Sequence, residues 1–129
     1  MRKTLAESNP GKAPAPPVLD DNVVAELMAI GGSDALFHRV VDLFLSKAPE
    51  GLRKIADERA ATDIAALADA AHALKSMCSN IGARRAVLAC HDLEHAARTR
   101  ADFDAGEKIE TITRELHEVM TKVKKLRAA

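Results

Sequence analysis

The sequence contains no tryptophan and no tyrosine, and it has only three phenylalanines in 129 residues. Its apolar fraction is therefore mostly aliphatic, and no apolar run reaches the roughly 18 residues that a transmembrane helix requires. Two cysteines, Cys78 and Cys90, are too few for a disulfide framework and lack the CxxC spacing of a zinc or redox site. We therefore expect an aliphatic core that contains reduced thiols.

Net charge is also absent, because 19 lysines and arginines balance 19 aspartates and glutamates. Without a net field, we expect no nucleic-acid partner and no membrane partner. Residues 1–10 have no apolar stretch of the signal-peptide type, which favours a cytoplasmic location. There is no glycine-rich phosphate loop, so the sequence predicts no ATP site.

Two regions differ in composition. Residues 1–17 hold four of the five prolines, and such a segment cannot bury enough apolar surface to fold alone. We predict that it is a disordered tail or linker. Residues 18–129 instead show apolar residues at spacings of three and four, without the alternation of strands. This second region is predicted to be one helical domain.

The spacing of apolar residues predicts an all-α fold. The expected helices are about 20–29, 34–59, a third between Thr62 and Gly82, 83–100 and 104–127. Ser33 is expected to cap the second helix and Thr62 the third, and Pro49 is expected to kink or split the second helix. Four long amphipathic helices with short connections predict an antiparallel four-helix bundle, with the short first helix at one end.

His72 is the most informative residue of the predicted third helix. It lies away from the apolar stripe of that helix, so its ring is expected to face outward. The residues in its own row are all small, namely Ala65, Ala68, Ser76 and Ser79. A solvated face more often carries long charged side chains, so this row predicts a surface that a partner can approach closely. Lys75, one turn on, can offset the charge of a phosphoryl group on His72.

Three further candidates lie on the predicted fourth helix. Glu94 is at the edge of its apolar seam, where a carboxylate needs a hydrogen-bond partner. If this edge faces the third helix, Glu94 can accept the Nδ1 proton of His72 and leave Nε2 unprotonated and nucleophilic. His91 lies on the same flank of this helix. Arg84 opposes the dipole at the helix start, which makes it a candidate docking residue for an acidic or phosphoryl-bearing partner.

These residues together resemble a known family. The segment His72-Ala-Leu-Lys75, followed by Gly82-Ala83 and then by Cys90-His-Asp-Leu93-Glu94, is similar to the histidine phosphotransfer (HPt) domains of two-component phosphorelays. The resemblance covers about residues 20–127. It implies that the histidine is phosphorylated on Nε2, that the lysine assists, that the glutamate hydrogen-bonds the histidine and that Gly82 ends the helix. The related phosphotransfer domains of chemotaxis kinases have a histidine in the place of His91, which makes His91 a candidate auxiliary residue. The sequence departs from the family at three positions. Ser76 and Met77 follow the lysine where the family often has Gly and then Ser, and Ala86 stands where the family often has Leu.

The resemblance also implies a function. The chain is expected to accept a phosphoryl group reversibly from a phospho-aspartate on the receiver domain of a hybrid histidine kinase, and to pass it to the receiver of a response regulator. It is then a phosphoryl carrier and not an enzyme. The receiver is expected to supply Mg²⁺, so the chain needs no cofactor or metal of its own, and we expect a monomer.

Two other interpretations remain open at this stage. The chain can be a non-phosphorylated helical adaptor, which binds receiver domains and signals by binding alone. It can also be a metal-binding bundle, because His91 and His95 lie four residues apart. The second interpretation lacks further ligands, since the cysteines are expected to face the core. Neither alternative explains the small side chains around His72.

Overall fold

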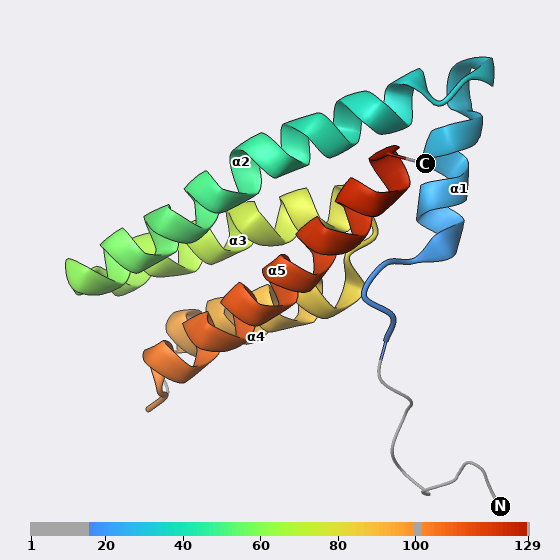
Figure 1. Cartoon of the computed structure of the whole chain (residues 1–129). Helices are drawn as coiled ribbons and strands as arrows, with labels where there is room; N and C mark the ends of the chain where they lie inside the picture. The colour runs from blue at the N-terminus through green and yellow to red at the C-terminus, as the bar shows by residue number, and fades with distance from the viewer. Residues whose placement is uncertain (1–15, 100–101, 129) are drawn as a thin grey trace, which may run out of the picture.

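The computed structural model describes residues 16–99 and 102–128 (Figure 1). Within these ranges the chain forms only helices: α1 (Asp21–Ala29), the 3-10 helix η1 (Ile30–Gly32), α2 (Ala35–Ala60), α3 (Ile64–Asn80), α4 (Arg84–Thr99) and α5 (Ala105–Ala128). The all-α prediction is confirmed. None of the helices in the described residues is long and apolar enough to cross a membrane. The predicted tail falls outside the description, except for Pro16 and Pro17.

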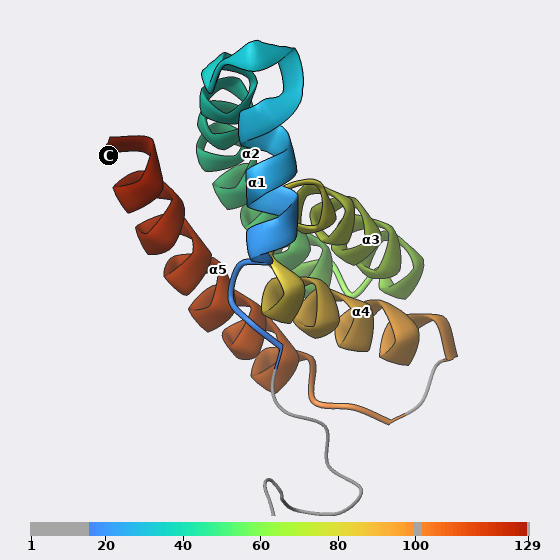
Figure 2. The same cartoon turned by 90° about the vertical axis from the view of Figure 1, so that its right-hand side faces the viewer.

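The four long helices close into a bundle. Helix α2 contacts α3, α3 contacts α4, α4 contacts α5, and α5 contacts α2, an arrangement that can be followed in Figure 2. Short connections reverse the chain between successive helices, so the bundle is antiparallel as predicted. Fully buried side chains from all four helices meet inside it, among them Phe37, Leu74, Leu93 and Ile112.

Both cysteines lie in this core. Cys78 of α3 and Cys90 of α4 are free thiols with no exposed surface. The contact with Cys78 and the burial together raise the pKa of the Cys90 thiol above its ordinary value. The thiol therefore stays protonated, and it packs as a small apolar group.

Helix α2 continues through Pro49, so of the predicted kink or split the split is wrong. Figure 1 shows α2 as one continuous helical ribbon. Proline removes the N–H that would reach the carbonyl of Leu45, but Pro49 is on the exposed side, where water can satisfy that carbonyl. Buried Ala48 and Ile55 hold the helix against the core on both sides of the proline.

The connection between α2 and α3 also differs from its prediction. Thr62 does not cap α3, because it has a positive φ of 57° and donates its hydroxyl to the carbonyl of Ala61. The cap is Asp63, whose Oδ1 accepts from the amide of Ala66 at 3.0 Å. The tight turn needs one left-handed residue, and Thr62 takes that conformation, which leaves the extended capping position to Asp63.

Helix α1 packs at one end of the bundle, as predicted. The amide of Asp20 donates to the carbonyl of Gly82, in the turn between α3 and α4, at 2.7 Å. Gly82 has a φ of +78°, and a Cβ atom at this position would lie 2.8 Å from Cβ of Val23. Only glycine permits this close approach with this backbone conformation. The turn that ends α3 therefore also anchors the start of α1.

Candidate functional site

His72 lies on the outer face of α3. Its side chain is 55% exposed, while Leu67, Ala71, Leu74 and Cys78 on the opposite face are buried. The helical period alone explains this, because positions 67, 71, 74 and 78 form one stripe and position 72 lies off it. The ring is thus open to a partner on one side and supported by the bundle on the other.

Glu94 of α4 meets the ring from the supported side. Its Oε2 lies 2.9 Å from Nδ1 of His72, and its side chain is only 10% exposed. When Nδ1 carries the proton, it donates to this oxygen, and Nε2 is left with a free lone pair. The structure therefore brings together the two residues between which the sequence analysis expected a hydrogen bond.

Two cations hold the Glu94 carboxylate. Lys75 Nζ forms an ion pair with Oε1 at 2.7 Å, and Arg98 Nε donates to Oε2 at 3.1 Å. Burial alone would raise the pKa of this carboxyl, but the contacts with Lys75, Arg98 and His72 lower it to about 2. Glu94 is therefore ionised at neutral pH and can act as a hydrogen-bond acceptor.

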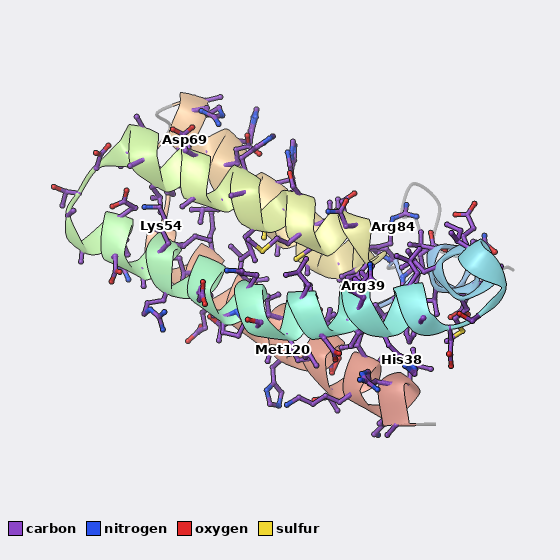
Figure 3. The ribbon with its side chains drawn as sticks, turned by 90° about the horizontal axis from the view of Figure 1, so that it is seen from above. His38, Arg39, Lys54, Asp69, Arg84 and Met120 are labelled. Atoms are coloured by element: carbon purple, nitrogen blue, oxygen red, sulfur yellow. The ribbon has the colours of Figure 1, made fainter. Side chains whose placement is uncertain are left out.

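Lys75, which the sequence predicts to offset the charge of a phosphoryl group on His72, forms an ion pair within the chain. Its side chain is 23% exposed, and its ammonium group lies on the carboxylate beside His72. Arg98 was not among the predicted site residues, although its i,i+4 spacing from Glu94 was a signal that could have identified it. Its Nη2 also donates to Oδ1 of Asp69 on α3 at 3.2 Å. Figure 3 shows Asp69 near the start of α3.

The predicted row of small residues is only partly exposed. Ala65, Ser76 and Ser79 are exposed, but Ala68 is 1% exposed, so its predicted place on a docking surface is wrong. Helix α4 packs on this flank of α3, since Glu94 reaches His72 and Arg98 reaches Asp69. The Ser76 hydroxyl donates to the carbonyl of His72 at 3.2 Å, within its own helix.

His91 stands apart from this cluster. Its ring stacks on His95, with centroids 6.0 Å apart, and no hydrogen bond in the described residues joins it to His72. The two rings line a cavity of about 420 Å³ together with Asp92 and Asp102. In the described part of the chain, no group of three or more His, Cys, Asp or Glu residues is arranged to hold a metal ion.

Arg84 lies beyond the end of α3 (Figure 3). Its Nη1 donates to Oδ2 of Asp20 at 3.0 Å, while its side chain stays 57% exposed. The unfavourable position of a cation at a helix start suggested an acidic neighbour, and the structure supplies one from the same chain. Arg84 thus helps to attach α1 to the bundle.

An apolar groove, which was not predicted from the sequence, lies between α1, α2 and α3. Its volume is about 560 Å³, and its lining residues are Leu27, Val40, Leu43, Phe44, Lys47, Met77 and Asn80. Met77 and Asn80 belong to the helix that carries His72. Leu43 is 59% exposed. A leucine on the exposed side of an amphipathic helix was the signal that could have identified the groove.

Comparisons with known proteins agree with this geometry. The family model described as "Hpt domain" matches residues 39–125. Among solved structures, the chain is similar to histidine-containing phosphotransfer protein B from Pseudomonas aeruginosa PAO1, with 32% sequence identity and a TM-score of 0.81. The match covers 87% of this chain and 96% of that one. Among curated protein sequences, none matches the chain.

Proposed function

Because this chain belongs to the Hpt domain family, the histidine phosphotransfer modules of phosphorelays, we propose that His72 is the residue that carries its phosphoryl group. The family places the chain among phosphoryl carriers rather than enzymes. The observation that supports His72 is its geometry: Nδ1 is held by a nearly buried carboxylate, and the ring is exposed. Of the other histidines, His38 lies 3.5 Å from the exposed Asp34, and His91 stacks on His95.

The proposed transfer depends on which ring nitrogen of His72 carries the proton. The lone pair of Nε2 attacks the phosphorus of a phospho-aspartate on a receiver domain, and the bond from phosphorus to the aspartate oxygen breaks. The aspartate leaves as a carboxylate, and the imidazole becomes a phosphoimidazolium that keeps its proton on Nδ1. The ionised Glu94 stabilises the positive charge of that ring. In the reverse step, the aspartate of a second receiver attacks the phosphorus.

The receiver completes the site in this proposal. We expect it to supply the acceptor aspartate and Mg²⁺, while this chain supplies an oriented histidine. The donor is the receiver domain of a hybrid histidine kinase, and the acceptor is a response regulator. The exposed side chains of Ala65, Ser76 and Ser79 leave room for close approach to His72. We further propose that the receiver covers the apolar groove between α1, α2 and α3. Two residues that line this groove, Met77 and Asn80, belong to α3, the helix that carries His72.

Transfer of labelled phosphate tests the proposal. A receiver domain phosphorylated with radiolabelled phosphate is incubated with the wild type, with His72→Gln and with His117→Gln, an exposed histidine of α5. We expect acid-labile, base-stable label on the wild type and on H117Q, and none on H72Q. Label on folded H72Q would overturn the assignment. A wild type that binds active receivers but never takes label would favour the adaptor function.

A further inference from the structure

Arg98 and Asp69 extend the site beyond the residues given a role above. We propose that Arg98 is a positioning residue: anchored to Asp69 of α3, it orients the Glu94 carboxylate so that Oε2 faces Nδ1 of His72. This inference rests on the proposed role of His72, and it concerns how the ring is prepared before any phosphoryl group arrives.

The contacts show how Arg98 acts on the histidine. Its Nε donates at 3.1 Å to Oε2 of Glu94, the same oxygen that lies 2.9 Å from Nδ1 of His72. The Glu94 side chain has three rotatable bonds, and a hydrogen bond to one oxygen leaves the carboxylate free to turn about it. With Lys75 on Oε1 and Arg98 on Oε2, both oxygens are restrained. The remaining lone pair of Oε2 is then directed to the histidine.

The planar guanidinium group is suited to this position. Nε contacts Glu94 on α4, while Nη2 contacts Asp69 on α3 at 3.2 Å, so one rigid group joins the two helices that carry the histidine and its acceptor. A lysine has a single charged nitrogen on a flexible stem, and it cannot present two separated donors in a fixed plane. The arginine geometry therefore couples the carboxylate to the helix of His72.

The exposure of the outer pair favours a positioning role over a stabilising one. The Asp69 side chain is 75% exposed and that of Arg98 is 48% exposed. Ion pairs at such exposed sites contribute little to stability. The hollow beside Asp69 is also lined by Lys47, Glu50 and Lys54 of α2, so several charged groups surround this aspartate. The effect we expect of Arg98 is therefore on the orientation of Glu94.

The test measures the tautomer of the His72 ring without any phosphate donor. Nitrogen-15 NMR of the full chain, at an alkaline pH where imidazole is neutral, gives the ratio of Nδ1-protonated to Nε2-protonated ring. The variants are Arg98→Gln, Arg98→Lys and Asp69→Asn. The matched controls are Arg127→Gln and Asp42→Asn, because Arg127 donates to Asp42 at 2.8 and 3.2 Å in an arginine–aspartate pair between α5 and α2.

We expect R98Q to lower the ratio of Nδ1-protonated to Nε2-protonated ring roughly threefold or more, and D69N to lower it less. The ratio in R98K should lie between those of R98Q and the wild type. The controls should leave the ratio unchanged, even if they lower stability as much as R98Q does. An unchanged ratio in folded R98Q, or an equal change in R127Q, would overturn the inference. If R98Q fails to fold, D69N decides, since it alters only an exposed side chain. The label-transfer test with H72Q does not depend on the tautomer of the ring, so it tests the proposed function separately from this inference.

Discussion

His72 and Glu94 are 22 residues apart in the sequence, and their side chains meet at 2.9 Å between Nδ1 and Oε2. The contact crosses from α3 to α4, the two helices on either side of the Gly82 turn. It places an ionised carboxylate behind a ring whose other side is exposed. In the proposed transfer, the nucleophilic nitrogen is therefore selected by a residue that the phosphoryl donor need not touch.

Removing the acceptor should slow phosphoryl transfer. Glu94→Ala leaves Nδ1 without a partner, so the ring loses its preferred tautomer and its fixed orientation. We expect the initial rate of label transfer from a phosphorylated receiver to fall by about 10- to 100-fold. The rate should fall less in Glu94→Gln, because the amide oxygen of the glutamine can still accept a hydrogen bond from Nδ1. Glu118→Ala, an exposed change on α5, is the control, and an unchanged rate in folded E94A would contradict the role of Glu94.

The stability that Glu94 contributes should depend on pH. Its pKa is about 2 in the folded chain and 4.5 ordinarily, so the folded state favours the ionised form. The contribution is then complete above pH 4.5 and is lost as the pH falls toward 2. We expect the free energy of unfolding of the wild type to exceed that of E94Q by about 1 to 2 kcal/mol at pH 7, after allowance for solvent screening. The difference should become progressively smaller as the pH falls. Urea unfolding at several pH values measures the difference. A gap that stays constant with pH would exclude the linkage.

Gly82 should be far less tolerant of alanine than Gly32. Both have a positive φ, of 78° and 75°, but an added Cβ at Gly82 meets Val23 at 2.8 Å, whereas one at Gly32 meets no atom within 4 Å. Gly32→Ala should therefore cost only the backbone strain, about 1 kcal/mol. Gly82→Ala should cost about 2 to 4 kcal/mol, because the α1 segment must also move. Chemical unfolding compares the two variants, and equal losses would show that the contact with Val23 relaxes freely.

The apolar groove should contribute to receiver binding. Leu43→Glu places a charge at the groove, and we expect the Kd for a receiver that accepts label to rise about tenfold, which corresponds to about 1.4 kcal/mol. Leu88→Glu is the matched control. Leu88 is 51% exposed and Leu43 is 59% exposed, but Leu88 lies on α4, away from the groove. Titration calorimetry with both variants distinguishes a docking surface from a general effect of charge. Equal weakening by both would place the receiver elsewhere.

Much of the fold could be predicted because helices follow local patterns. The apolar spacing located all five helices to within one or two residues and placed His72 outside the core stripe. The errors arose where local rules competed. Pro49 stays inside α2 because tertiary packing holds the helix on both sides, and Asp63 rather than Thr62 caps α3 because the turn needs a residue of positive φ.

The sequence by itself determined the helices, the outward direction of His72 and the family to which the chain belongs, since these depend on residues close together in the chain. Tertiary structure alone decided how α4 is rotated against α3. That rotation turns Lys75 onto Glu94 and brings Arg98 to Asp69. A helical wheel defines each face of a helix but not which face meets a neighbour, because that choice depends on how all four helices fill the core together.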